Sequence, residues 1–448
     1  MKLAMIGTGY VGLVSAACLA DFGHVVTCVD KDVAKLDMLL RGEMPIYEPG
    51  LDELVNHNVA EGRLRFTTDI DAAVGGADAV FIAVGTPSRR EDDRADLSYV
   101  FAAAEEIARA MTGFTVVAVK STVPVGTGDE IERIIRRVRP EADAVVVSNP
   151  EFLREGFAIS DFKHPDRIVV GLDDQRGRVV MHEIYRVLYL DALPILFTRR
   201  RTGELIKCAA NAFLATKITF INEIADICEM ADADVQEVAR GIGLDNRIGP
   251  KFLRAGPGFG GSCFPKDIRA LAETARDLQT PSRIVEAVRT ANEERKTRMF
   301  ERIVGACGGS VEGKTIAVLG LTFKPDTDDM RESPSIPIIS QLQRAGARIC
   351  CFDPAGMDQS RAVLDDVRYA RDPYECAEGA QAVCILTEWN AFRALDLARL
   401  KAVLAEPLVI DLRNIYRLED MQREGIRYIS IGRPDIEIPV RLRLAKAG

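Results

Sequence analysis

The sequence predicts an α/β protein with two doubly wound parallel-sheet domains joined by a long central helix and a helical connector domain. Three observations indicate this fold class. A strand, a glycine turn, a helix and a second strand follow one another at the N-terminus, helical periodicity dominates the middle of the chain, and strand-like segments resume at residue 313. Strands that alternate with helices form parallel sheets covered on both faces. We expect the domains to span residues 1–198, 199–305 and 306–448, the first and last of them Rossmann-like.

Short apolar runs mark the strands of the first domain, and helix-like segments lie between several of them. A helix is expected at 13–22, directly after the first strand. The strands are expected at 2–6, 24–29, 79–84, 115–120, 144–148 and 167–170.

The turn between the first strand and the first helix reads GTGYVG, in which Gly7, Gly9 and Gly12 have the spacing GxGxxG. Glycine-rich turns are common, and a purely structural turn is the alternative interpretation. Here Asp30 stands 18 residues after Gly12, at the end of the second strand, close to the spacing of a carboxylate that binds ribose. The glycines would let a pyrophosphate lie on the helix N-terminus. Because Asp30 would repel a 2′-phosphate, the sequence favours NAD over NADP as the cofactor.

Two further loops, at 84–88 and 121–123, each follow a predicted strand. Ligands bind at the carboxyl edge of open α/β sheets, so both are candidate cofactor loops, with ordinary turns as the alternative. Two polar pairs have a spacing of four residues: Glu151 with Glu155, and Lys207 with Asn211. Each pair would share one face if its segment is helical, and a solvated surface is the alternative interpretation.

The middle of the chain has helical periodicity throughout. Its long first helix could bury an apolar face within the chain or in a second subunit, and we expect a homodimer or a higher homo-oligomer through this domain. The helices are expected at 202–231, 235–241, 267–278 and 281–300. In the last domain a helix is expected at 335–345, and strands at 313–320, 347–352, 382–386 and 407–410.

Cys263 lies in the run GFGGSCFPKD, where glycines let the backbone approach a ligand and the thiolate is a nucleophile. A buried packing cysteine is the alternative. The small neighbours of Cys263 provide little core, and Lys266 could stabilise a thiolate. Five basic residues near glycines, prolines or strand ends outside the first domain could converge on a phosphate-bearing substrate, although each alone could be a surface charge: Arg247, Arg254, Lys324, Arg331 and Arg413.

The composition excludes several classes of protein. The net charge of −9 argues against nucleic-acid binding, which normally leaves a basic footprint. The ten cysteines form no CxxC pair, which favours reduced thiols over a disulfide framework and gives no metal site. No leader peptide and no apolar run long enough to span a bilayer is recognised, so a cytoplasmic protein without membrane association is expected.

Motifs along almost the whole chain resemble those of the nucleotide-sugar 6-dehydrogenases, the UDP-glucose/GDP-mannose dehydrogenase family. They include IGTGYVGLV, PIYEPGL, VGTPS, STVPVGTG, NPEFLREG, KCAANAFLATKI, GLDNRIG, KFLRAGPGFGGSCFPKD, GLTFKPDTDDMRESPS, ILTEWNAF and DLRNIY. The resemblance implies an enzyme that oxidises a sugar C6 alcohol twice, with two NAD, to a uronic acid. Cys263 would hold the aldehyde as a thiohemiacetal and then as a thioester.

The resemblance also implies roles for individual residues. Lys207 and Asn211 would stabilise oxyanions, Asp267 and Thr122 would hold or activate water, and Glu151 would assist thioester hydrolysis. Cofactor positions are matched by Gly7, Gly9, Tyr10, Val11, Gly12, Asp30, Lys35, Thr86, Thr122, Glu155, Lys266 and Arg331. Nucleotide-sugar positions are matched by Glu151, Phe152, Leu153, Lys207, Asn211, Arg247, Arg254, Gly256, Gly258, Phe259, Gly260, Lys324 and Arg413.

The segments KFLRAGPGFGGSCFPKD and LTEWNAF are more similar to the branch of the family that acts on UDP-glucose. GDP-mannose and UDP-N-acetyl sugars are the alternative substrates in the same family. A two-electron dehydrogenase with a structural Cys263 is an alternative that needs only the evidence of the first domain. An NAD-dependent sensor or binding protein that has lost catalysis would be a different class, and the set of polar residues above argues against it.

Overall fold

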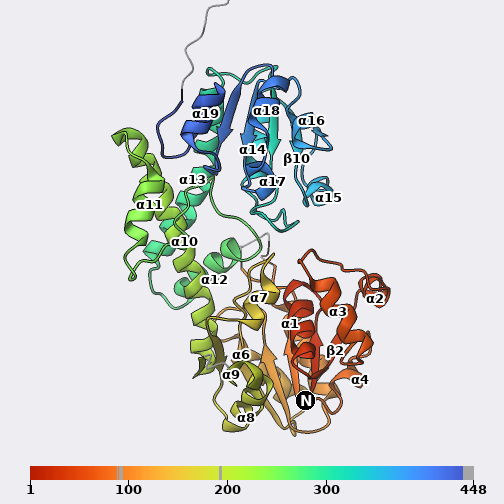
Figure 1. The fold of residues 1–448 in the computed structure, drawn as a ribbon. Coiled ribbons are helices and arrows are strands. Elements are labelled where there is room, and N and C mark those ends of the chain that lie inside the picture. Colours follow the sequence, from red (N-terminus) through yellow and green to blue (C-terminus); the bar gives the residue numbers. More distant parts are fainter. Residues whose placement is uncertain (88, 90–93, 191–193, 437–448) are drawn as a thin grey trace, which may run out of the picture. The chain divides into compact units, whose positions relative to one another are not determined.

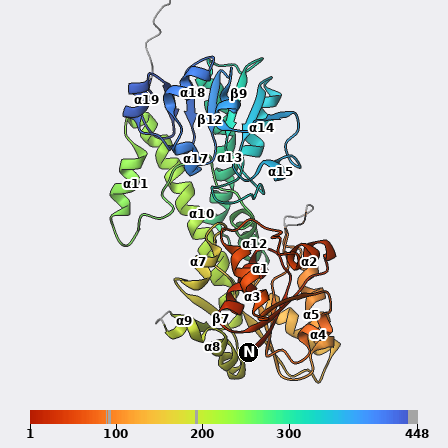
Figure 2. The same ribbon diagram turned by 45° about the vertical axis from the view of Figure 1, so that its right-hand side comes forward.

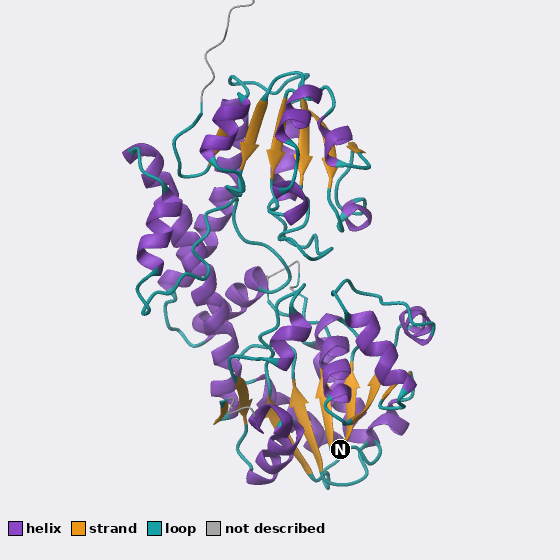
Figure 3. Cartoon of the chain, viewed as in Figure 1, coloured by secondary structure: helices purple, strands orange, loops and turns teal. Residues whose placement is uncertain are grey.

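The computed structural model describes residues 1–87, 89, 94–190 and 194–436, and the chain divides into two compact units. Unit 1 consists of Met1–Ala212 with Lys266–Ser282, and unit 2 of Phe213–Pro265 with Arg283–Gly448. Each unit has its own sheet, and Figure 3 shows the strands of each sheet with helices around them.

The sheet of unit 1 has eight strands in the order β3-β2-β1-β4-β5-β6-β7-β8. All neighbours are parallel except β6 and β7, which pair antiparallel through Ser148 and Gly171. The six predicted strands are confirmed, and the two outermost strands, β3 and β8, were not predicted. The strands are β1 (Lys2–Ile6), β2 (Val25–Val29), β3 (Leu64–Thr67), β4 (Ala79–Ile82), β5 (Thr115–Val119), β6 (Ala144–Ser148), β7 (Ile168–Gly171) and β8 (Ile195–Thr198).

Helices cover both faces of this sheet (Figure 1). Side chains of a strand alternate between faces, and in β1 Leu3 and Met5 join one buried cluster while Ala4 and Ile6 join the other. The first cluster includes residues of α1 (Tyr10–Asp21), α2 (Val33–Leu40), α3 (Leu51–Ala60), α7 (Ala158–Lys163) and α8 (Gln175–Ile184). The second includes residues of α4 (Ile70–Val74), α5 (Ser98–Ala110) and α6 (Thr127–Val138); α9 (Arg186–Leu190) follows α8 in the chain.

The sheet of unit 2 has six parallel strands in the order β11-β10-β9-β12-β13-β14. It repeats the arrangement of unit 1, because Ile316 and Val318 of β9 face one cluster while Ala317 and Leu319 face the other. The strands are β9 (Thr315–Leu319), β10 (Arg348–Phe352), β11 (Val367–Tyr369), β12 (Ala382–Ile385), β13 (Leu408–Asp411) and β14 (Arg427–Ser430). The helices are α14 (Ser335–Arg344), α15 (Met357–Ser360), α16 (Pro373–Ala377), α17 (Asn390–Arg393), α18 (Leu397–Val403) and α19 (Leu418–Glu424). The predicted fold class of two doubly wound domains is confirmed.

The central helices follow the predicted order with shifted ends. They are α10 (Arg200–Ala231), α11 (Val235–Gly243), α12 (Phe264–Asp277) and α13 (Arg283–Ala306). The last of them continues beyond the predicted end at residue 300, because buried Ile303 and Ala306 extend its apolar face after Met299. In unit 2, α11 lies alongside the part of α10 that belongs to this unit (Figures 1 and 2).

Candidate active site

In unit 1 the strand order reverses between β1 and β4, the place where open α/β sheets bind ligands. Gly7 follows β1 with φ +100°, and a Cβ there would lie 2.7 Å from the carbonyl oxygen of Ala83, just after β4. A Cβ on Gly12 would lie 2.0 Å from the carbonyl oxygen of Gly7. Both positions therefore require glycine, so that β1, β4 and α1 can pack closely.

Gly9 has a different environment, which shows whether the turn has room for a dinucleotide. It is the N-cap of α1, and a Cβ built on it would meet no atom within 4 Å. No acidic residue lies in the first turn of α1, which begins with Tyr10 and Val11. The space above Gly9, with the free N–H groups of the helix start, fits the pyrophosphate of NAD.

Asp30 lies directly after β2 and faces this turn. Its carboxylate accepts hydrogen bonds from the N–H (2.8 Å) and the hydroxyl (2.6 Å) of Thr8 and from the N–H of Asp32 (3.0 Å). Burial alone would raise the pKa of Asp30, but these hydrogen bonds outweigh it and lower the pKa. The ammonium of Lys35 lies 3.4 Å from the same carboxylate. An ionised carboxylate at this strand end fits the ribose of NAD.

Glu48 is a residue near this turn that the sequence analysis did not single out. Its carboxylate accepts hydrogen bonds from the hydroxyl of Tyr10 and from the N–H groups of Gly156 (2.6 Å) and Ala158 (2.7 Å). It thereby joins the start of α1 to the start of α7, next to Glu155. Burial, followed by the carboxylate of Glu48, raises the pKa of Tyr10. The motif PIYEPGL contains Glu48 and was the available signal.

A second set of predicted residues forms one connected network in unit 1. The hydroxyl of Thr86 donates to the carbonyl oxygen of Thr122 (3.1 Å) and accepts from the ammonium of Lys266 (3.1 Å). Lys266 also lies 3.2 Å from the carboxylate of Asp267, which accepts from the side-chain amide of Asn211 (2.6 Å). Asp267 is fully buried. The loop after β4, the loop after β5, α12 and α10 therefore meet at these side chains; Ser88, at the end of the first loop, lies outside the described residues.

Lys207 lies one turn before Asn211 on α10, so the predicted helical spacing is present. Its ammonium is 3.3 Å from the carboxylate of Glu151 and 5.2 Å from the ring centroid of Phe152. The condition that 151–155 be helical is not met, because residues 151–154 have no regular secondary structure and a turn follows. Glu151 instead accepts a hydrogen bond from the N–H of Leu153, which fixes its carboxylate toward Lys207.

A buried lysine that the sequence analysis did not assign lies near enough to this pair for their charges to influence its pKa. Lys120 directly follows β5, and its ammonium lies 3.4 Å from both the amide oxygen of Asn149 and the hydroxyl of Tyr185. Burial lowers the pKa of Lys120 to about 8, while the charge of Glu151 acts in the opposite direction. Its partners come from distant positions of the chain, so no local pattern could have indicated the cluster.

Cys263 belongs to unit 2 and differs from the other cysteines in its exposure. It is half-buried, whereas the nine others are buried. Its sulfur lies 3.5 Å from the hydroxyl of Ser262. Burial raises the pKa of Cys18 and Cys208 to about 12, which leaves these thiols protonated at neutral pH. The accessible thiol is the one set in the glycine run.

The predicted basic residues of unit 2 have different environments. Arg413 follows β13 and is mostly buried, and it donates to the carbonyl oxygens of Leu386 (2.7 Å) and Phe323 (3.1 Å). A Cβ on Gly256 would lie 3.1 Å from its guanidinium. Lys324 lies beside the ring of Phe323. The structure thus brings Arg413, Gly256 and Lys324 to the strand ends of this sheet.

The other three basic residues are more exposed. Arg254 is exposed in the loop before the glycine run, and Arg247, 89% exposed in its side chain, pairs with Asp245. The guanidinium of Arg331 donates two hydrogen bonds to Asp329, both 2.8 Å long, and the backbone N–H of Arg331 donates a third (2.9 Å).

Two further properties concern the described part of the chain. Within it, no group of three or more His, Cys, Asp or Glu side chains is placed to hold a metal ion. None of its helices is long and apolar enough to cross a membrane.

A glycine turn with a ribose-type carboxylate, a buried polar network beside it and a second doubly wound sheet define a dinucleotide-dependent dehydrogenase. Comparison with known proteins agrees with this class. Models of the UDP-glucose/GDP-mannose dehydrogenase family match its NAD binding domain at residues 1–189, its central domain at 201–294 and its UDP binding domain at 317–418. The chain belongs to this family and is an NAD-dependent oxidoreductase.

Relatives match over nearly the whole chain. A UDP-glucose 6-dehydrogenase of Rhizobium meliloti (strain 1021) is 63% identical over 97% of this chain and 100% of its own length. One of Bacillus subtilis (strain 168) is 46% identical over 97% of this chain and 94% of its own length. A solved UDP-glucose dehydrogenase from Pyrobaculum islandicum has a TM-score of 0.89 and 38% identity, and the match covers 96% of this chain and 98% of that one. The expected family, fold and cofactor are therefore confirmed.

Proposed function

We propose that this chain oxidises the C6 alcohol of UDP-glucose in two successive steps and releases UDP-glucuronate, with Cys263 as the covalent nucleophile. The names of its relatives support the substrate. The single observation that carries the chemistry is the buried polar network of unit 1, in which Lys207 contacts Glu151 and Asn211 contacts Asp267. A protein that only binds NAD has no need of a buried ion pair and a buried amide–carboxylate hydrogen bond in one place.

In the first step a hydride and a proton leave the C6 alcohol, and an aldehyde forms. NAD, when bound at the glycine turn, accepts one hydride at each of the two oxidations. The developing charge on the C6 oxygen would be stabilised by the ammonium of Lys207 and the side-chain amide of Asn211. A lost donor of this kind costs about 10²–10³ in kcat. The proton would pass to water held by Asp267 and by Thr122.

In the next step the thiolate of Cys263 adds to the aldehyde carbon. A C–S bond forms, the carbonyl π bond breaks, and the oxygen takes a proton to give a thiohemiacetal. This intermediate has a C–H bond on a carbon that bears oxygen, so a second hydride can leave, together with the hydroxyl proton, to give a thioester. The thiol would therefore retain the aldehyde between the two oxidations.

Hydrolysis completes the reaction. Water adds to the thioester carbonyl, the C–S bond breaks, and Cys263 leaves as a thiolate while the carboxylate forms. Glu151 would accept the proton of the attacking water, because its carboxylate is held in place by Lys207 and by the N–H of Leu153. General-base help of this kind typically contributes about 10²–10⁴ in rate.

The remaining predicted residues would bind the two ligands. The cofactor would contact the glycine turn with Tyr10 and Val11, and also Asp30, Lys35, Thr86, Glu155, Lys266 and Arg331. The nucleotide sugar would contact Phe152, Leu153, Arg247, Arg254, Gly256, Gly258, Phe259, Gly260, Lys324 and Arg413.

We also propose a homodimer in a reducing, cytoplasmic compartment. Phe213, Phe220 and Ile227 of α10 recur every seven residues and are 66%, 48% and 60% exposed. A heptad of large apolar residues on one helix is the pattern of helix-to-helix association. The absence of a disulfide bond among the cysteines of the described residues supports a reducing compartment.

The test is to incubate limiting UDP-glucose with excess NAD and to count the NADH formed. Two NADH per sugar, with UDP-glucuronate as the product, are expected. A plateau at one NADH per sugar would rule out the covalent four-electron scheme. GDP-mannose and a UDP-N-acetyl sugar are run in parallel, and a higher kcat/KM for either would replace UDP-glucose as the substrate.

A further inference from the structure

The segment of residues 256–261, called here the glycine segment, precedes Cys263 in unit 2, and its glycines have little room for a side chain. A Cβ on Gly260 would lie 2.3 Å from the carbonyl oxygen of Glu332, and one on Gly261 would lie 2.7 Å from the ring of Phe323. The N–H of Gly261 also donates to the carbonyl oxygen of Arg331 (2.9 Å). One side of the segment is therefore held by the loop after β9.

Helix α13 holds the other side of the glycine segment through Asn292. The side-chain oxygen of Asn292 accepts from the N–H of Phe259 (2.9 Å), and its side-chain nitrogen donates to the carbonyl oxygen of the same residue (3.1 Å). The amide thus satisfies both backbone groups of Phe259, as a neighbouring β-strand would. Asn292 is only 4% exposed, so water does not compete for these bonds.

Gly258, immediately before Phe259, is shaped to this contact. Its φ of +118° is a conformation that residues with a side chain rarely adopt. A Cβ there would lie 2.9 Å from the side-chain oxygen of Asn292. The glycine at this position therefore allows the asparagine to approach the backbone.

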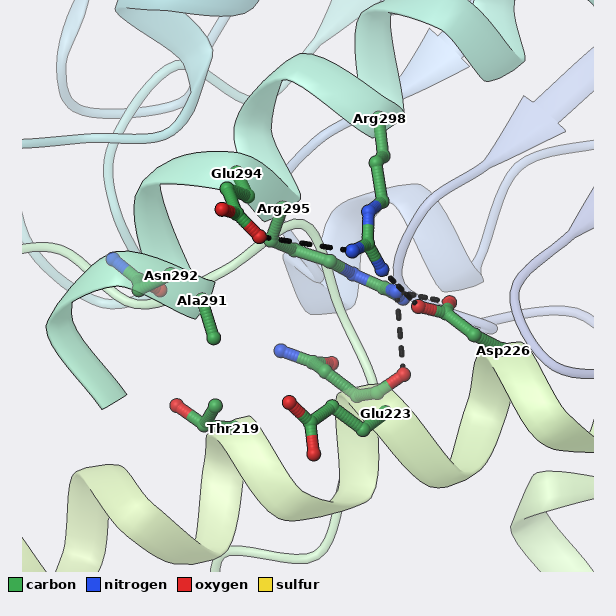
Figure 4. A pocket seen from close by; sticks show the side chains of 9 residues that line it. Thr219, Glu223, Asp226, Ala291, Asn292, Glu294, Arg295 and Arg298 are labelled. Carbon is green, nitrogen blue, oxygen red and sulfur yellow. Dashed lines mark hydrogen bonds and ion pairs between the residues drawn. The ribbon is translucent and has the colours of Figure 1, made fainter. Parts of the chain in front are cut away.

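A second anchor holds the start of the segment, at Gly256. Its N–H donates to the side chain of Asn222 on α10 (2.8 Å), and its carbonyl oxygen accepts from the guanidinium of Arg295 (3.2 Å). Arg295 is 4% exposed and pairs with Asp226. Figure 4 shows Asn292 and Arg295 on α13, with the guanidinium of Arg295 against Asp226 of α10, around a cavity of about 40 Å³. This volume is far below the roughly 300 Å³ of a ligand site, so we take the side chains here to stabilise the backbone that they contact.

We propose that Asn292 is a positioning residue, which fixes the backbone of the glycine segment so that it fits the nucleotide sugar. The inference rests on the proposed function, in which Gly256, Gly258, Phe259 and Gly260 contact that substrate. The hydrogen bonds of the Asn292 side chain go to the backbone of the segment, and the residues proposed to contact NAD belong to unit 1, with the exception of Arg331. Loss of the amide should therefore weaken binding of the nucleotide sugar and leave binding of NAD unchanged.

The test compares the wild type with Asn292→Ala, Asn292→Asp and the control Asn58→Ala. Asn58 is also a buried helical asparagine, but it lies in unit 1 and bonds Leu54 and Arg63. Asn292→Ala should raise the KM for UDP-glucose about tenfold, since both hydrogen bonds to the backbone of Phe259 are lost. The aspartate keeps an acceptor for the N–H of Phe259 but sets a second carboxylate oxygen against the carbonyl oxygen of Phe259, so its KM should rise at least as much as that of Asn292→Ala. The KM for NAD should stay within twofold in every variant.

A purely structural role would give a different result. It would lower the amount of active enzyme and hence the apparent kcat, with both KM values as in the wild type and with Asn58→Ala behaving in the same way; that pattern would overturn the proposal. Calorimetric titration with UDP needs no turnover, and Asn292→Ala should bind UDP about tenfold more weakly. A wild type that forms one NADH per sugar would contradict the covalent scheme alone, whereas unchanged UDP binding in Asn292→Ala would contradict the positioning role alone.

Discussion

Cys263 combines partial exposure with a backbone held by its neighbours, and its chemistry can be separated from cofactor binding. Replacement of Cys263 by alanine should abolish net turnover of UDP-glucose while the Kd for NAD stays within twofold, because NAD is expected at the glycine turn of unit 1. Steady-state NADH formation and a fluorescence titration with NAD measure the two quantities. Cys351→Ala, at a buried thiol of β10, is the control and should keep its turnover. Normal turnover of Cys263→Ala would remove this thiol from the mechanism.

Lys120 should make the stability of unit 1 depend on pH. Its folded pKa of about 8 is below the usual 10.5 because the ammonium is buried. Between these values the unfolded chain carries a proton that the folded chain lacks, so stability rises with pH. The cost of burying the charge is fully present below pH 8 and is relieved as the pH increases to about 10.

The test compares urea unfolding of the wild type with that of Lys120→Met from pH 7 to 10. Methionine cannot titrate, so any stability advantage of the variant should shrink above pH 8, by up to about 1.4 kcal/mol per pH unit. The other titrating groups cancel in the difference between the two proteins. A difference that is constant over the whole range would show that Lys120 does not titrate there.

Residue pairs on one helix could be predicted from the sequence, whereas pairs between distant elements could not. The spacing of Lys207 and Asn211 indicates a common face of α10, as found. Asn292 lies 33 positions after Phe259, and Tyr185 lies 65 after Lys120, so only the fold brings each pair together. The family motifs indicated the first kind of residue and missed the second.

At the scale of elements, the start of α1 allows a structural role of a glycine to be distinguished from a ligand-binding role. Gly9 has open space where its Cβ would lie, so alanine should be tolerated by the folded protein but should collide with a pyrophosphate. Gly9→Ala should therefore keep the wild-type Tm within about 2 °C and raise the Kd for NAD at least tenfold. Gly113→Ala, at an equally open loop position of unit 1, should change neither quantity. Unchanged NAD affinity in Gly9→Ala would exclude this helix start as the pyrophosphate site.

The four strands that were not predicted are the outermost strands of the two sheets: β3, β8, β11 and β14. Central strands such as β4 and β5 are buried on both faces, and so they read as continuous apolar runs. Three of the edge strands keep polar or partly exposed positions, as in LRFT of β3 and VRY of β11, whereas β14 (RYIS) is buried at all positions except Arg427. Periodicity therefore detects the middle of a doubly wound sheet better than its edges.

At the scale of the whole molecule, the six strands of the second sheet follow the same order as the first six of the first sheet, but the two sheets differ at the acid that follows their second strand. In unit 1, Asp30 keeps 14% of its side chain exposed beside the glycine turn. In unit 2, Asp353 is 1% exposed and accepts from the N–H of Leu321 (2.7 Å) and the indole of Trp389 (3.2 Å). The carboxylate of Asp353 is buried and occupied by hydrogen bonds within unit 2, so it cannot bind a ribose. This difference supports one cofactor domain and one substrate domain, as the family assignment requires.

The exposed apolar residues of α10 make the proposed dimer testable. Phe220→Glu would place a charge at the centre of the heptad face formed with Phe213 and Ile227, and burying that charge in an interface costs several kcal/mol. Light scattering after size-exclusion chromatography should give a mass near twice that of the chain for the wild type and near that of one chain for the variant. Val179→Glu, at a 71% exposed position of α8, is the control and should keep the wild-type mass.

Because Phe220 lies on the same helix as Asn222, which bonds Gly256, loss of the dimer should also raise the KM for UDP-glucose more than that for NAD. A monomeric wild type would leave this face without a partner copy and would overturn the proposed dimer.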